Sequence, residues 1–168
     1  CKNLTNLGNN NLSDWTLPAA TDVSYMFCND NLLSAISTGN WSLQSATDIS
    51  YMFSDCSSLT ALDVSNWGIS AALKKMDCAF YNCARVSALN MSGWDVSGLS
   101  SAFAAFSKMS ALTNANISGW IPSNLQIANS LFAYDYSLAS INIGSSTAPQ
   151  LRDAAGMFYN CISLESVG

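Results

Sequence analysis

Residues 47–67 read TDISYMFSDCSSLTALDVSNW, and versions of this stretch recur along the chain. Its first seven residues repeat residues 21–27 with one conservative difference, Ile49 in place of Val23. Self-similarity at a fixed period is the signature of a repeat architecture, and it decides how the rest of a sequence is interpreted.

Two aromatic columns share one period. Both contain the same single-residue insertion between Trp67 and Phe80, a coincidence that chance does not explain. The spacing is 26 or 27 residues throughout, for Trp at positions 15, 41, 67, 94 and 120 and for Phe at positions 27, 53, 80, 106, 132 and 158. The sequence therefore predicts one solenoid segment over residues 1–168, built from about six 26-residue units.

Each unit is predicted to contain a short strand and a short helix. The apolar residues Leu59, Leu62 and Val64 indicate a strand that alternates inward and outward residues at its end. The stretch that leads to each Phe indicates a helix of about two turns, with Asp22, Asp48 and Asp153 at its N-cap. The expected fold is thus an α/β solenoid of the leucine-rich-repeat type, with the Trp and Phe columns packed in its core rather than exposed as platforms for sugars.

The two ends of the chain fall in the same part of the repeat. Cys1, Leu4 and Leu7 match Cys161, Leu164 and Val167, and neither end shows the polar cap that a solenoid needs for solubility. The chain is predicted to be cut from a longer array, or to stack end to end.

Composition excludes several classes of partner. The net charge is −5, with six Lys and Arg, so there is no cationic face for nucleic acid or for an anionic membrane surface. No run of about 18 apolar residues is present, so no membrane-spanning segment is expected. Charged residues make up only 10%, and Ser, Asn and Thr must supply the polar surface, a composition common in extracellular proteins.

The sequence predicts no enzyme, cofactor or metal site. The chain has no His, which removes the commonest general base and the nucleophile arrangements that depend on it. Paired carboxylates remain conceivable, for example Asp14 with Asp22 or Asp135 with Asp153. Four of the six cysteines share a column that also accepts Met, so buried free thiols are favoured over a disulfide, such as one between Cys56 and Cys83, or a metal.

Two tracks of small polar residues are predicted along the outward strand face. A hydrogen-bonding surface of this kind suits a glycan or an extended protein ligand, although a merely solvated sheet face explains it as well. The candidate residues precede the Trp position by four or by two places: Asn11, Ser37, Asp63, Asn90, Asn116 and Asn142, and Ser13, Ser65, Ser92 and Ser118, with Gly39 and Gly144 completing the second track.

Glycosylation bears on this face. N-x-S/T sequons occur at Asn3, Asn11, Asn40, Asn90 and Asn116, and glycans on three of them would cover it.

The unit M-F-x-x-C-x-x-L-x-x-L-x-V-S-x-W, followed by T-D-x-S-x-M-F, resembles the BspA-like leucine-rich repeat family of surface proteins. The cleanest copy runs from Met52 to Trp67, and Met157 to Cys161 supports it, whereas later copies carry Met109 and Asp135 in place of the Cys. The resemblance implies an extracellular or cell-surface protein that adheres to host cells or matrix.

The sequence thus leads to three hypotheses about function. The first is a secreted or surface adhesion module that binds a host or matrix protein or glycan through its strand face. The second is a structural subunit of an extracellular filament, sheath or virion appendage that self-associates end to end. The third, binding of ice or mineral, is weaker because the tracks mix residue types.

Overall fold

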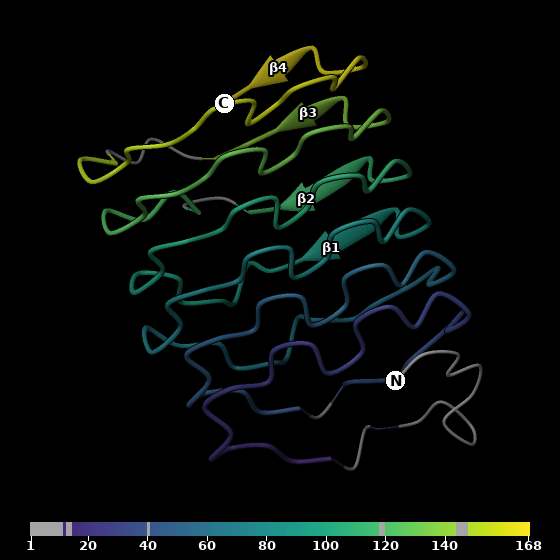
Figure 1. The fold of residues 1–168 in the computed structure, drawn as a ribbon, viewed down its shortest axis with the longest axis vertical. Helices are drawn as coiled ribbons and strands as arrows, with labels where there is room; N and C mark the ends of the chain where they lie inside the picture. The colour runs from purple at the N-terminus through teal and green to yellow at the C-terminus, as the bar shows by residue number, and fades with distance from the viewer. Residues whose placement is uncertain (1–11, 13–14, 40, 118–119, 144–147) are drawn as a thin grey trace.

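A computed structural model describes residue 12 and residues 15–39, 41–117, 120–143 and 148–168. These residues form a solenoid whose coils stack along one axis, with the lower-numbered coils at the bottom of Figure 1. A row of parallel bridges on one side joins each coil to the next at intervals of 26 or 27 residues, through Asp22, Asp48, Lys75, Ser101, Ile127 and Asp153 in that order.

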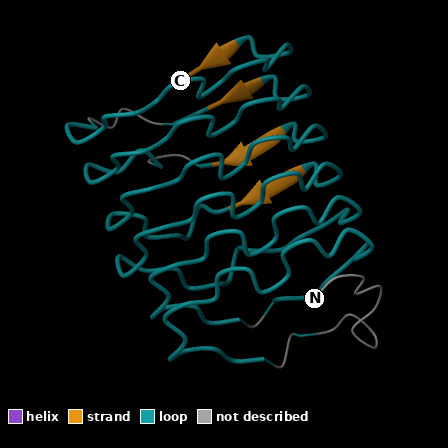
Figure 2. Ribbon diagram, viewed as in Figure 1, coloured by secondary structure: helices purple, strands orange, loops and turns teal. Residues whose placement is uncertain are grey.

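Short parallel strands lie on another side of the stack (Figure 2). β1 (Ala88–Asn90) pairs with β2 (Asn114–Asn116), and β3 (Ser140–Ile141) pairs with β4 (Ser166–Val167). Within β1, Leu89 is buried while Ala88 and Asn90 are exposed, as the two-residue period of a strand requires. β1 and β3 therefore present one face to the core and one to solvent, whereas both residues of β4 are exposed.

The predicted helix in each unit is wrong, because no helix occurs among the described residues. The stretch before and after each Phe is instead a run of turns. It contains two residues per coil in the left-handed region, such as Tyr51 and Asp55 with φ of 58° and 63°. An α-helix requires right-handed dihedral angles at every residue, so these two positions exclude it. The described part of the chain consequently has no helix that could cross a membrane.

Hydrogen bonds explain why the turns are stable without a helix. Every second N–H donates to the next coil, as Tyr51 N does to Asp77 O at 2.8 Å and Phe53 N to Ala79 O at 2.8 Å. The alternate N–H groups close four-residue β-turns inside the coil, as Ser54 N does to Tyr51 O at 3.2 Å. The backbone is thus satisfied partly by the neighbouring coil, which a sequence window within one unit cannot reveal.

The aspartates that suggested helix N-caps do cap the backbone, but they cap turns. Oδ1 of Asp22, Asp48 and Asp153 accepts from the N–H two residues later, at 2.9, 2.8 and 3.0 Å. A side chain that bonds two residues ahead forms an Asx turn, and the same residue types serve both purposes. The capping signal was real, and its assignment to a helix was the error.

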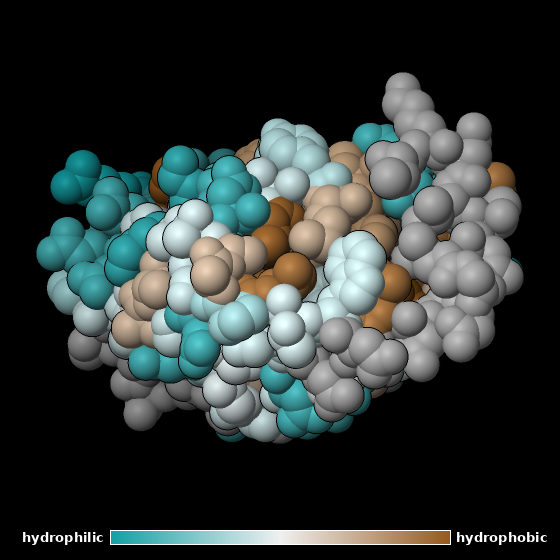
Figure 3. All heavy atoms as spheres, turned by 90° about the horizontal axis from the view of Figure 1, so that it is seen from below, coloured by the Kyte–Doolittle hydropathy of each residue, from teal (hydrophilic) through white to brown (hydrophobic). Residues whose placement is uncertain are grey.

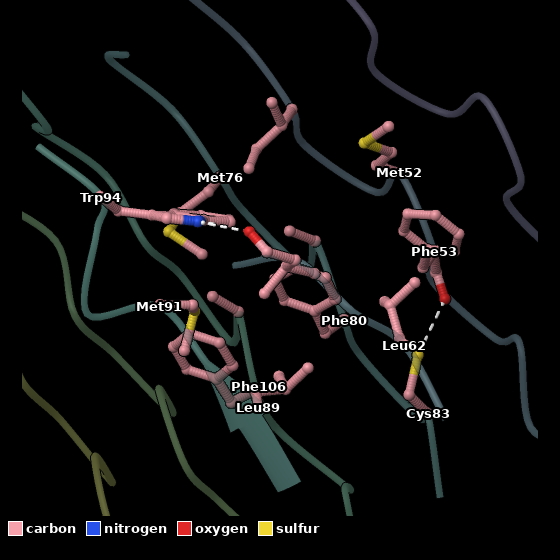
Figure 4. Packing of buried hydrophobic residues seen from close by; sticks show 14 of the residues in the cluster. Met52, Phe53, Leu62, Met76, Phe80, Cys83, Leu89, Met91, Trp94 and Phe106 are labelled. Atoms are coloured by element: carbon pink, nitrogen blue, oxygen red, sulfur yellow. Dashed lines mark hydrogen bonds between the residues drawn. The ribbon is translucent and has the colours of Figure 1, made fainter. Parts of the chain in front are cut away.

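The aromatic columns pack in the core, as predicted from their spacing. Trp41, Trp67, Phe53 and Phe80 are buried, and adjacent rings of each column lie 5.1 to 6.3 Å apart between centroids. Figure 4 shows the Phe column beside Leu and Met side chains from several coils. Trp15 differs, because 45% of its surface is exposed. Viewed from below, apolar side chains gather in the middle of the described surface (Figure 3).

The cysteines described by the structure are free thiols, and Cys56 and Cys83 are buried. The Sγ atom of Cys56 donates to the carbonyl oxygen of Phe27 in the preceding coil at 3.1 Å. The Sγ atom of Cys83 donates likewise to Phe53 O at 3.2 Å (Figure 4). Burial raises the pKa of Cys56 to about 12 and raises that of Cys83 as well. These two thiols are structural, as the column that also accepts Met suggested.

The one-residue insertion lies on the side of the coil between the Trp position and the bridge row. The turn closed by Leu73 N and Ser70 O is equivalent to the turn closed by Leu99 N and Val96 O in the next coil. The extra residue therefore falls between Trp67 and Ser70, where Gly68 has a φ of 62° that glycine adopts without strain. The insertion is absorbed there, and the bridge row continues with Lys75.

Candidate binding surface

A groove follows the outward strand face across four coils. It consists of two adjoining hollows of about 460 and 320 Å³ that share Ala61 and Asp63. The first is lined by Thr60, Ala61, Leu62, Asp63, Ser87, Ala88, Leu89, Asn90 and Asn114, and the second by Ala35, Ile36, Ser37, Thr38, Gly39, Ala61 and Asp63. We call this surface the strand-face groove.

The hollow arises from small side chains in one column. Leu62 and Leu89 point into the core, whereas Ala61 and Ala88 beside them are exposed and fill little space. Because strands of neighbouring coils lie about 4.8 Å apart, the column of small residues leaves a channel along the solenoid axis. The fold thus fixes a long, narrow surface rather than one deep pocket.

Asp63 and Asn90 connect the two predicted polar tracks. Asp63 Oδ1 accepts from Ser65 N at 3.0 Å and from Ser65 Oγ at 2.6 Å. Asn90 Oδ1 accepts from Ser92 N and Ser92 Oγ at 3.3 and 2.9 Å. The bonds from Ser65 hold the pKa of the Asp63 carboxyl below its usual value, so Asp63 is ionised at neutral pH. Each pair closes a turn at the end of the strand, which is a structural role.

The structure brings together only part of the predicted site. Ser37, Asp63 and Asn90 line the strand-face groove, while the exposed Asn142 follows β3 and is not among its lining residues. Three other candidates, Asn11, Ser13 and Ser118, fall outside the described residues, and Asn116 is described only through its place in β2.

Sequence reasoning missed the column that makes the groove. Ala35, Ala61, Ala88 and Asn114 lie six residues before the Trp position, so they belong to the same repeat alignment as the predicted tracks. The signal was present as a column of small outward residues. Alanine has no hydrogen-bonding group, so a search for polar tracks does not find this column.

The described lining of the groove offers few titratable groups. Among the described residues that line the groove, Asp63 is the one charged residue, and the others offer hydroxyl, amide and methyl groups. No group of three or more His, Cys, Asp or Glu side chains that could hold a metal ion occurs in the described ranges.

The carboxylates considered for catalysis are committed elsewhere. Asp135 is fully buried and accepts from Met109 N at 2.8 Å. Asp153 accepts from Asn129 and Ala155, so the two carboxylates share no partner. Asp14, proposed with Asp22, lies outside the described residues.

Comparison with solved structures gives a match to a leucine-rich repeat protein from Bacteroides ovatus, with a TM-score of 0.47 and 17% sequence identity. The match covers 82% of this chain and 35% of the Bacteroides protein, so this chain spans about a third of that protein's length. No curated protein matches the sequence.

A sequence family provides the assignment. The family described as "Mycoplasma protein of unknown function, DUF285" matches residues 2–113 and again residues 74–167. The two matches overlap and together take in nearly the whole repeat array. The chain belongs to the DUF285 family.

Proposed function

We propose that this chain is a non-enzymatic adhesion module of a secreted or cell-surface protein, which binds a host protein or glycan through the strand-face groove. The observation that carries the proposal is the groove itself, a channel that continues over four coils and is lined by hydroxyl, amide and methyl groups. A channel along the stack fits an extended polymer better than a compact small molecule.

The chemistry of the lining defines the partner further. Among the described residues that line the groove, Asp63 alone is charged, and Ala61 and Ala88 leave room for the partner's own side chains or sugar rings. An extended chain that offers hydrogen-bond donors and carries no strong negative charge satisfies both features. Resemblance to BspA-like surface proteins supports a location outside the cell.

The test is binding of the repeat array to intact host cells and purified matrix proteins. The blocking variant is Ala61→Phe with Ala88→Phe, which fills the groove while leaving the turn-closing residues Asp63 and Asn90 in place. The matched control is Ala71→Phe, an exposed alanine on another side of the coil. Saturable binding that the blocking variant loses and the control keeps supports the proposal.

Equal binding by both variants, or no binding to any surface by the folded protein, would contradict it. Pre-treatment of the host surface with protease or with glycosidase then separates a protein ligand from a glycan. Enzymatic N-glycosylation at Asn90 provides a further check, because a glycan there would abolish binding through the groove.

A further inference from the structure

A second hollow, of about 380 Å³, lies where the row of turns ends and is separate from the strand-face groove. It is formed by two repeat positions in three successive coils. The first position contributes Asn82, Lys108 and Tyr134, and the second contributes Ala84, Ser110 and Tyr136. We call this hollow the tyrosine pocket.

Backbone geometry fixes the first set of side chains. Asn82, Lys108 and Tyr134 all adopt left-handed φ angles, of 57°, 63° and 67°. Their N–H groups donate to the next coil at 2.9, 2.8 and 2.7 Å. The backbone at the three positions is therefore held at the spacing of the coils before any ligand arrives, which lowers the entropic cost of binding.

The tyrosines of the pocket are departures from the repeat. Tyr134 stands at a position where the other coils have Asn, Asp or Lys. Tyr136 stands at a position that is Ser or Ala in three other coils, Asn31 in one and Ile162 in another. Tyr136 is 41% exposed, so its ring does little for the core. The two rings meet edge to face, with centroids 6.4 Å apart at 80°. Two aromatic walls at a surface where the fold accepts small polar residues indicate a site for a ligand.

One positive charge stands beside these walls. The Lys108 ammonium lies 5.0 Å from the centroid of the Tyr81 ring, a cation–π contact. A hydrogen bond with Tyr81 raises the pKa of Lys108, so the ammonium persists well above neutral pH.

Negative charge near the pocket is reduced. Asp135, between the two tyrosines in sequence, is fully buried, and burial raises its pKa to about 9, so it is neutral at pH 7. The nearby Asp55 accepts a hydrogen bond from Asn82 Nδ2 at 2.8 Å, so one oxygen of that carboxylate is already bonded to a side chain of the pocket.

We propose that the tyrosine pocket binds a pyranose sugar that carries a carboxylate. The apolar face of the sugar ring packs on the exposed Tyr136, Tyr134 borders the edge of the sugar, the carboxylate pairs with Lys108, and sugar hydroxyls bond with Ser110 and Asn82. A volume of about 380 Å³ lies within the range of small-molecule sites and holds one sugar unit. Lys108 is the one cation among the described lining residues, and a polyanion such as nucleic acid needs a cluster of cations.

The experiment is a titration of the ¹⁵N-labelled chain with methyl β-glucuronide, followed by amide chemical shifts. Methyl β-glucoside tests the carboxylate, and N-acetylglutamate amide tests the sugar ring. Glucuronide should shift the amides of Asn82, Lys108, Ser110 and Tyr136 in a saturable manner. The glucoside and the glutamate derivative should bind about tenfold more weakly, since a charge-assisted hydrogen bond or a stacked ring contributes on the order of 1.4 kcal/mol.

Variants connect the binding to the pocket. Tyr136→Ala should weaken glucuronide binding about tenfold, and Lys108→Gln should remove the preference for glucuronide over glucoside. Tyr25→Ala, at a tyrosine that is 57% exposed and stacked on Tyr51, is the control and should bind as the native chain does.

Three outcomes overturn the proposal: no saturable shifts at the pocket, equal binding of glucoside or the glutamate derivative, or unchanged binding by Tyr136→Ala. The thermal unfolding midpoints of the Tyr136 and Lys108 variants should be unaltered, because both side chains are exposed. Unaltered midpoints show that a loss of binding is not a loss of fold. None of these outcomes depends on the strand-face groove.

Discussion

The indole N–H of Trp67 donates to the hydroxyl oxygen of Thr38 in the preceding coil, at 3.1 Å, in the buried core. The same hydroxyl donates to Asp63 O at 2.6 Å. In neighbouring coils the indole bonds a backbone carbonyl instead, as Trp94 does with Val64 O at 2.9 Å. Thr38, which stands where the repeat has an aliphatic residue, thus serves as a polar partner inside the stack.

Replacing Thr38 with Val should therefore destabilise the solenoid although the two side chains have similar shape. The change removes the acceptor of the Trp67 indole and the donor to Asp63 O, and unsatisfied buried polar groups cost about 1–3 kcal/mol. Urea unfolding measures the loss. Thr60→Val is the control, because Thr60 is exposed and its hydroxyl bonds Ser34 O at 3.1 Å. Equal losses in the two variants would contradict the role of Thr38.

The aromatic columns should differ in energy according to burial. Trp67→Ala opens a cavity in the core and should cost about 3–5 kcal/mol, and Phe80→Ala should cost a similar amount. Trp15→Ala should cost much less, because 45% of that side chain is already exposed. Denaturant midpoints of the three variants test this order, and a sub-kilocalorie effect at Trp67 would show that the column does not carry the core.

The buried carboxyl of Asp135 should make stability depend on pH. Burial raises its pKa to about 9 from 3.8, so the folded state keeps a proton that the unfolded state releases. The contribution of this carboxyl to the free energy of unfolding is fully present below pH 3.8. It falls as the pH rises toward about 9, by at most about 1.4 kcal/mol per pH unit.

Asp135→Asn keeps an acceptor for Met109 N but removes the titration. The free energy of unfolding of the variant, measured in urea, should therefore rise relative to that of the native chain as the pH goes from 5 to 9. Asp63→Asn is the opposite control: its pKa is lowered, so the native carboxylate contributes stability above the unfolded pKa that is lost in acid. A constant difference between Asp135→Asn and the native chain at every pH would refute a buried neutral acid.

Close packing between coils should show at Gly98. A methyl group added there would overlap the carbonyl oxygen of Ala71 in the preceding coil and lie 2.6 Å from Lys74 Nζ. The backbone oxygen cannot move without disturbing the stack, so Gly98→Ala should cost about 1–3 kcal/mol. Gly39→Ala meets nothing within 4 Å and should have little effect. Thermal unfolding of the two variants makes the comparison, and equal midpoints would contradict it.

The period, the core columns and the outward tracks could be read from the sequence because each repeats with every coil. Trp67 and Phe80 recur at fixed intervals, and burial of such a column is the simplest reason for its recurrence. The turns could not be read in the same way. Whether Tyr51 or Cys78 adopts a left-handed φ depends on hydrogen bonds to the next coil, and neither Tyr nor Cys is a residue type that favours this conformation.

The candidate sites divide along the same line. The strand-face groove follows from a repeated position, so a complete alignment of the units, alanines included, would have found it. The tyrosine pocket depends on two exceptions to the repeat, Tyr134 and Tyr136, and these flank a buried aspartate in the Cys column. Only the stacking of three coils places Asn82, Lys108 and Tyr134 side by side.

The bridge row has a consequence for how such a chain changes between generations. Each coil offers its neighbour the same backbone donors and acceptors at the same positions, from Asp22 through Asp153. Unequal crossing-over between two repeats would add or delete a whole coil. The coils brought together would still form the same backbone hydrogen bonds with each other. The length of the groove is then a heritable variable, which adjusts in steps of about 4.8 Å without any new fold.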